Sequence, residues 1–204
     1  MATRLEPFRD YSEHEVINLF SLAVAADQDL SAWKAGASDV NDAGVVVAAS
    51  AGAKIPGDLP SSNALITDGT TSLRKYLGAS DQAHVGYNAY PIVEMTVEAA
   101  TANPIGITLK QTLAYDENDE NLLRYPLKAD ELQSVLPGQA VPILTRGLVL
   151  LSASAFSDVA GIGAGAGIEL DDGNAGQFKL LAAGTKVGTC LASGTGKFLC
   201  KVSF

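Results

Sequence analysis

The stretch AVPILTRGLVLLSA, residues 140–153, is the longest apolar run in the sequence that favours a strand. Its valine, isoleucine and leucine side chains suit the pleated, partly buried surface of a β-sheet. Gly147 interrupts the run, and a glycine inside a strand often marks a bulge or a bend. The run therefore predicts a long strand with an irregularity at Gly147.

The chain after this run repeats a pattern of short strand and turn. Four apolar segments follow one another: AGIEL (166–170), GQFKLL (176–181), KVGTCLA (186–192) and KFLCKVSF (197–204). Asp-Asp-Gly-Asn and Ser-Gly-Thr-Gly punctuate them as turns. Short strands at even spacing are typical of a compact antiparallel β-sandwich or a small barrel. We therefore expect a mainly β protein, less than about a fifth of it helical.

The chain before residue 140 adds further strand patterns and one helix. Strands are predicted within 44–50, 90–99 and 104–115, and the apolar segment 15–25 fits a strand or a short helix equally well. The prolines of 55–63 predict a loop. Leu73, Tyr76 and Leu77 have helical spacing, with threonines before them and Gly78 after them, which predicts a short helix over 70–78.

The expected organisation is an N-terminal segment, 1–25, followed by a β-rich domain, 26–204, in which 26–90 has no assigned architecture. Residues 1–13 are polar and hold few large apolar side chains beyond Leu5, Phe8 and Tyr11. We expect them to form an extended arm that becomes ordered on a partner protein or a sister subunit.

Composition excludes several classes of protein. Among 204 residues, 47% are hydrophobic and 18% charged, which is enough to bury a core. The net charge is −9 and the 14 Lys and Arg form no basic run, so we expect no binding to nucleic acid. The sequence contains no run of about 20 apolar residues, so it predicts no membrane span. The N-terminus has no signal-peptide pattern. We expect folding in a cytoplasm.

The glycine run AGIGAGAGIEL, residues 160–170, raises the question of phosphate binding. A dinucleotide fingerprint requires a strand before the glycines and a helix after them. Here the glycines lead into IELDDGN, which is a strand followed by an acidic turn. The run therefore predicts a loop before a strand. SGTGKF, residues 193–198, lacks the spacing of a P-loop, because Leu191 and Phe198 stand where glycine and Ser or Thr are needed. It predicts a hairpin turn.

Nothing in the sequence predicts a catalytic or metal site. Asp116, Glu117, Asp119 and Glu120 are the densest acidic stretch, but they lack the order of an EF-hand, and a solvated loop is favoured over a calcium site. His14 and His84 stand alone, and no nucleophile motif occurs. We therefore assign no catalytic, metal-binding or cofactor-binding residues, and no cofactor.

Cys190 and Cys200 flank the predicted C-terminal hairpin, and two cysteines are too few for a disulfide scaffold or a four-cysteine zinc site. A three-residue turn, 194–196, places Cys190 opposite Cys200, whereas a four-residue turn places Cys190 opposite Leu199. We favour the first, with a positive φ at Gly196. Both thiols are expected to be reduced.

The C-terminal part of the chain resembles the end of tailed-bacteriophage capsid decoration (cement) proteins and related virion proteins of marine phages. Val187, Gly188 and Leu191 match the penultimate strand of that pattern, and Val202 lies in its last strand. Upstream, residues 137–153 are similar to the core strands of the family, and 5–20 to the start of marine phage structural proteins. Region 26–90 departs from the pattern.

This resemblance implies a β-rich, non-enzymatic protein on the outer face of a phage head. Its partner would be the major capsid protein, it would assemble as a homo-oligomer, with a trimer favoured, and it would need no cofactor. An alternative is a head-fibre or tail module that binds host glycans, although such sites usually display exposed aromatics and the chain has one Trp. A small enzyme is the last alternative.

Overall fold

The computed structural model describes residues 4–20, 35, 41–49, 95–97, 103–122, 124–136, 139–174 and 176–204. Strands make up 47% of the described residues, which contain one α-helix. The strands of the two larger sheets pair antiparallel and close no barrel. The expectation of a mainly β fold is confirmed, and the arrangement is compatible with the sandwich rather than the small barrel.

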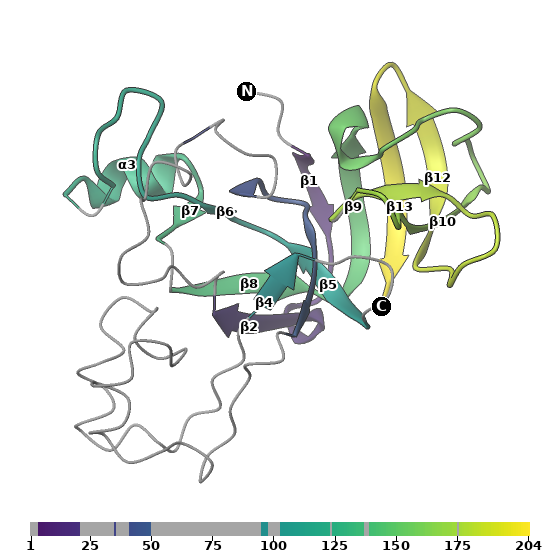
Figure 1. The fold of residues 1–204 in the computed structure, drawn as a ribbon, viewed down its shortest axis with the longest axis horizontal. Helices are drawn as coiled ribbons and strands as arrows, with labels where there is room; N and C mark the ends of the chain where they lie inside the picture. Colours follow the sequence, from purple (N-terminus) through teal and green to yellow (C-terminus); the bar gives the residue numbers. More distant parts are fainter. Residues whose placement is uncertain are drawn as a thin grey trace, which may run out of the picture.

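The larger sheet has six strands in the order β1-β9-β13-β12-β10-β11. Most of it comes from the C-terminal part of the chain (Figure 1, green to yellow). Its strands are β1 (Leu5–Asp10), β9 (Arg146–Ser152), β10 (Gly167–Leu170), β11 (Phe178–Leu180), β12 (Gly188–Gly194) and β13 (Lys197–Ser203). The four C-terminal strands predicted from the sequence are all present.

The second sheet has five strands in the order β2-β8-β5-β3-β4. These strands are β2 (Val16–Phe20), β3 (Val46–Ala49), β4 (Met95–Val97), β5 (Pro104–Thr108) and β8 (Ala140–Leu144). A small parallel pair, β6 (Gln111–Thr112) and β7 (Ser134–Val135), carries helix α3 (Pro126–Glu131) between its strands. The ambiguous segment 15–25 is thus a strand over 16–20, after a short 3-10 helix that ends at Glu15.

The predicted long strand 140–153 is two strands, one in each sheet. The chain turns at Thr145, whose backbone N–H and side-chain hydroxyl both donate to the carbonyl oxygen of Glu15, each at 2.8 Å. Its own carbonyl accepts the N–H of Phe204 at 3.1 Å. These bonds hold the corner between the two sheets, so one apolar run contributes to both.

The bulge or bend expected at Gly147 does not lie there, because β9 pairs with β13 in unbroken register from Arg146 to Ser152 and the chain bends at Thr145. Glycine is needed here for space. A Cβ at this position would lie 2.7 Å from the Cβ of Tyr11 and 3.2 Å from the carbonyl oxygen of Asp10. The small residue therefore lets the chain after β1 cross close to β9.

The main core lies between the two large sheets. Val149, Phe198 and Cys200 of the six-stranded sheet cluster with Val46 and Ile107 of the five-stranded sheet, all nearly inaccessible. The other face of the five-stranded sheet is buried as well, around Val45, Val47, Val141 and Ile143. Residues on both faces of β3 are therefore buried, which explains its unbroken run of valines.

The N-terminal segment differs from the free arm that we expected. Residues 5–10 are extended, but they form β1, which pairs with β9. Leu5 is 4% exposed within the main core, and the guanidinium of Arg4 donates to the carbonyl oxygen of Gly176 at 3.0 Å. A segment with few apolar residues can be ordered in this way because the rest of the chain supplies the core around Leu5.

The C-terminal hairpin has the predicted cysteine pairing by a different route. Gly194 pairs with Lys197, so the turn contains two residues, Thr195 and Gly196, and Gly196 has the expected positive φ of 69°. That turn alone would place Cys190 opposite Lys201. A bulge at Leu191 shifts the register by one residue, and Cys190 faces Cys200. Both thiols are free and buried.

The helix predicted over 70–78 lies outside the described residues. The α-helix that the structure describes, α3, was not predicted. It contains six residues and begins with Pro126, a residue whose fixed φ suits the first position of a helix. No residue of α3 is buried, so it has no apolar periodicity by which the sequence could have revealed it.

Candidate functional site

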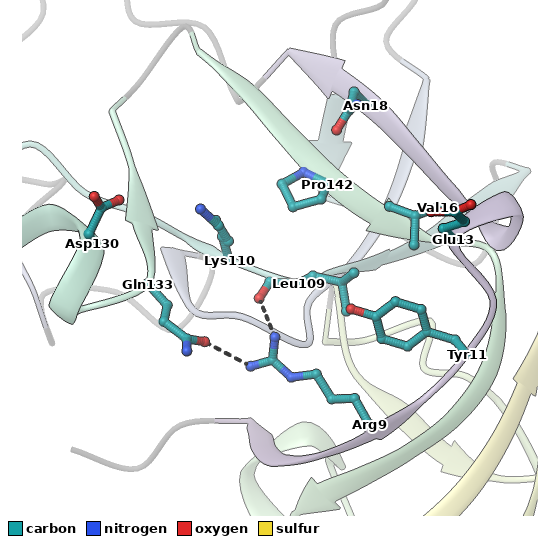
Figure 2. Close-up of a pocket in the computed structure, with 10 residues that line it drawn as sticks. All are labelled: Arg9, Tyr11, Glu13, Val16, Asn18, Leu109, Lys110, Asp130, Gln133 and Pro142. Carbon is teal, nitrogen blue, oxygen red and sulfur yellow. Dashed lines mark hydrogen bonds between the residues drawn. The ribbon is translucent and has the colours of Figure 1, made fainter.

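A hollow of about 600 Å³, here called the Arg9 cleft, lies where the end of β1 approaches β8 and the segment around α3. Figure 2 shows the side chains that line it. They are Arg9, Tyr11, Glu13, Val16, Asn18, Leu109, Lys110, Asp130, Gln133 and Pro142. The cleft is lined by cationic, anionic and apolar side chains. Its lining therefore favours neither an anionic nor a cationic ligand.

The Arg9 guanidinium is used for internal contacts in this cleft. Nη1 donates to the carbonyl oxygen of Leu109 and Nη2 to the side-chain oxygen of Gln133, each at 3.2 Å (Figure 2). Its Nε is buried and has no hydrogen-bond partner in the structure. Arg9 therefore ties β1 to the segments before β6 and before β7, and both of its terminal nitrogens are already engaged.

The acidic stretch 115–121 is a tight loop organised by one buried carboxylate. Asp116 Oδ1 accepts the backbone N–H groups of Asn118 and Glu120, both at 2.8 Å, and Oδ2 lies 2.5 Å from Nζ of Lys128 on α3. The Lys128 ammonium and these hydrogen bonds hold the pKa of Asp116 below its usual value. Glu117 and Glu120 lie farther from that ammonium, at 3.6 and 3.8 Å.

The prediction of a solvated loop is therefore wrong for Asp116, whose side chain is inaccessible. The side chains of Glu117 and Glu120 are about half exposed, as a solvated loop requires. Lys128 stands where a calcium ion would be needed to neutralise these carboxylates. Sequence reasoning missed this pairing because Lys128 comes from a helix that had not been predicted.

A second hollow, of about 570 Å³, lies beside β10 and β11. Glu169 is buried in its wall and accepts the backbone N–H of Gly184 at 2.6 Å. Nζ of Lys179 lies between three carboxylates, at 3.7 Å from Glu169, 3.8 Å from Asp171 and 3.7 Å from Asp172. The lysine thus offsets part of the negative charge of this group.

Asp171 belongs to the turn that follows the glycine run and β10. Hydrogen bonds from Ser157, from Asn174 and from the N–H of Gly173, together with the charge of Lys179, lower its pKa to about 2. Its Oδ2 accepts the amide of Asn174 at 2.7 Å. These bonds stabilise a structural turn. The glycine run forms turns and leads into a strand, as predicted, with positive φ at Gly161 and Gly165.

The remaining residues that the sequence singled out lie apart from these hollows. His14 is exposed on the short 3-10 helix η1 (Glu13–Glu15), and His84 lies outside the described residues. SGTGKF forms the end of β12, the turn and the start of β13, as expected for a hairpin. Burial and the neighbouring Cys190 raise the pKa of the Cys200 thiol.

Neither a metal centre nor a transmembrane helix appears in the described part of the chain. The His, Cys, Asp and Glu residues described form no group of three or more suited to a metal ion. None of the described helices is long and apolar enough to cross a membrane. Comparison with protein families, curated proteins and solved structures finds no match to the chain.

Proposed function

We propose that this protein is a virion structural protein, which binds the outer surface of a phage head and cements neighbouring major capsid proteins. The observation that carries the proposal is the position of the residues that resemble decoration proteins. These residues lie on three adjacent strands in the middle of the six-stranded sheet, β9, β13 and β12. Residues 146–152 form β9, Val202 is in β13, Gly188 and Leu191 are in β12, and Val187 directly precedes β12.

The way these residues pack supports the proposal. Val187 and Val202 are buried in the main core. A Cβ at Gly188 would lie 2.6 Å from the carbonyl oxygen of Lys201, so only glycine fits between these strands. The residues that resemble decoration proteins are thus the residues that build the sheet. The capsid-binding role itself is proposed by analogy with that family.

The distribution of exposed apolar side chains also favours attachment by several small contacts. In the described part of the chain, seven large ones are exposed: Phe8, Ile17, Tyr125, Leu127, Val159, Leu180 and Leu191. Tyr125 and Leu127 lie together at α3, and the other five are on separate strands or loops. In both hollows described above, charged lining residues are engaged in internal hydrogen bonds or ion pairs. Many weak contacts, repeated over a symmetric head, gain strength from multivalency. We further propose that the protein attaches as a homotrimer, as the resemblance implies.

Co-expression tests the proposal. The chain is produced together with the major capsid protein encoded by the same genome, and assembled heads are separated by sedimentation. We expect the protein to sediment with the heads in a fixed ratio to the capsid protein, and electron microscopy to place its density on the outer surface. If it remains with the soluble fraction, head binding is refuted. Binding to glycans on an array, without head binding, would support the tail or fibre alternative.

A further inference from the structure

The outer face of the six-stranded sheet carries a stripe of leucines. Along β9 and β13 the residues alternate between buried and more exposed, so Leu148, Leu150 and Leu199 lie on the face opposite the core. Leu150 and Leu199 are direct cross-strand partners. Leu191, at the bulge of the neighbouring β12, is 43% exposed. An apolar stripe on a sheet face is a common docking surface.

Two cations border this stripe. Arg146 and Lys201 are exposed, at the end of β9 and on β13, and neither has an ion-pair partner in the described part of the chain. Lys197, farther along β13, is neutralised by Glu6 at 2.9 Å. We call the four leucines with Arg146 and Lys201 the leucine face.

Helix α3 and the loop before it form a surface of the opposite charge. Leu127 is 79% exposed and Tyr125 49% exposed, which is unusual for large apolar side chains on so short an element. Five exposed carboxylates surround them, from Glu117, Asp119, Glu120, Asp130 and Glu131. The nearby cations are Arg124 and Lys128, and Lys128 already pairs with Asp116. We call residues 116–131 the acidic knob.

We propose that the acidic knob of one copy docks on the leucine face of a second copy, with Leu127 packed against the leucines and the carboxylates facing Arg146 and Lys201. Apolar surface then meets apolar surface, and unpaired cations meet an excess of anions. Packing two leucine faces together would instead bring two positively charged surfaces together, since Arg146 and Lys201 outnumber the exposed Asp10 opposite Leu148. Charge therefore selects the knob as the occupant.

The positions of the two surfaces make this contact head-to-tail. The knob and the β12–β13 hairpin lie at opposite ends of the long axis (Figure 1). A contact between two different patches leaves one unused patch at each end of the assembly. Further copies can therefore add, and they form a ring where the rotation between copies closes. The inference concerns self-association and does not depend on capsid binding.

Single charge and polarity changes on full-length protein test the contact. Leu127→Asp disrupts the knob, and Lys201→Glu or Leu191→Asp disrupts the leucine face. All three sites are exposed, so folding should be retained, which circular dichroism and the melting temperature verify. We expect each variant to weaken self-association at least tenfold in light scattering and sedimentation. Val159→Asp, an exposed apolar site on neither surface, is the matched control and should associate like the wild type.

Mixing the variants separates head-to-tail docking from other arrangements. Leu127→Asp keeps an intact leucine face and Lys201→Glu keeps an intact knob. Each alone should be a monomer, whereas an equimolar mixture should form a one-to-one complex that weakens as salt is raised. The proposal is overturned if the wild type is monomeric, if the mixture stays monomeric, or if Leu127→Asp associates normally. Loss of head binding by Lys201→Glu with normal self-association would make the capsid the occupant and would also overturn it.

Discussion

Gly106 shows how closely two strands approach inside this protein. It lies in β5, where a Cβ would sit 2.7 Å from Cγ2 of Ile143 and 2.9 Å from the carbonyl carbon of Leu144, and closer still to the Leu144 oxygen. The neighbouring atoms belong to β8 backbone and to a buried side chain, so they have little room to move.

Gly106→Ala should therefore lower the free energy of unfolding by about 1–3 kcal/mol, as measured by chemical denaturation. Gly163→Ala is the control, because no atom lies within 4 Å of its Cβ and its φ is not positive. We expect that variant to stay within about 0.5 kcal/mol of the wild type. Equal effects of the two substitutions would show that the close approach in β5 is absent.

Asp171 links stability to pH through its lowered pKa of about 2, against an ordinary 3.8. Because the folded state favours the ionised form, this carboxylate stabilises the protein above about pH 4 and loses that contribution as pH falls toward 2. The shift corresponds to about 2 kcal/mol at most. Lys179 lies 3.8 Å from this carboxylate and also approaches Glu169 and Asp172, at 3.7 Å each.

Asp171→Asn should lower the free energy of unfolding by up to about 2 kcal/mol at pH 7. The difference from the wild type should shrink between pH 4 and pH 2, as followed by denaturation at each pH. Asp172→Asn, whose side chain is 77% exposed, is the control and should change stability by less than about 0.5 kcal/mol. A difference for Asp171→Asn that persists unchanged at pH 2 would contradict the prediction.

Strand β1 contributes a residue to the core although its polar sequence predicts an extended arm. Leu5 is 4% exposed and Phe8 is 50% exposed on the same strand. We expect Leu5→Ala to lower the free energy of unfolding by about 2–4 kcal/mol, because it leaves a cavity between the sheets. Phe8→Ala should lower the free energy of unfolding by less than about 1 kcal/mol. If Leu5→Ala is as mild as Phe8→Ala in a thermal melt, β1 does not contribute to the core.

The two large sheets share one core, which predicts how the whole protein unfolds. Cys190 and Cys200 lie in that core, fully buried, and burial raises the pKa of the Cys200 thiol. Neither thiol should react with a disulfide reagent in the folded protein, and both should react in strong denaturant. Their reactivity should rise over the same denaturant range in which circular dichroism loses its β signal. Earlier thiol reaction would mean that the hairpin opens separately.

Local patterns in the sequence were enough to predict the mainly β class, the four C-terminal strands and the turns between them. These features are local, because alternation, β-branched side chains and glycine turns act within a few residues of one another. For the same reason, two local predictions are confirmed: the glycine run 160–167 is a loop before a strand, and the hairpin turn has a positive φ at Gly196.

Tertiary structure alone decided how the strands are shared between the sheets. Nothing local to 140–153 indicates that Thr145 turns the chain from one sheet into the other, since its partners are Glu15 and Phe204. Burial of Leu5 depends on residues distant in the sequence, among them Ala43 and its strand partner Leu151. The bulge at Leu191 that aligns the cysteines shows no glycine or proline signal. Asp116 is likewise buried only because α3 delivers Lys128 to it. Long-range contacts of this kind leave no periodicity in the sequence, so only the folded chain reveals them.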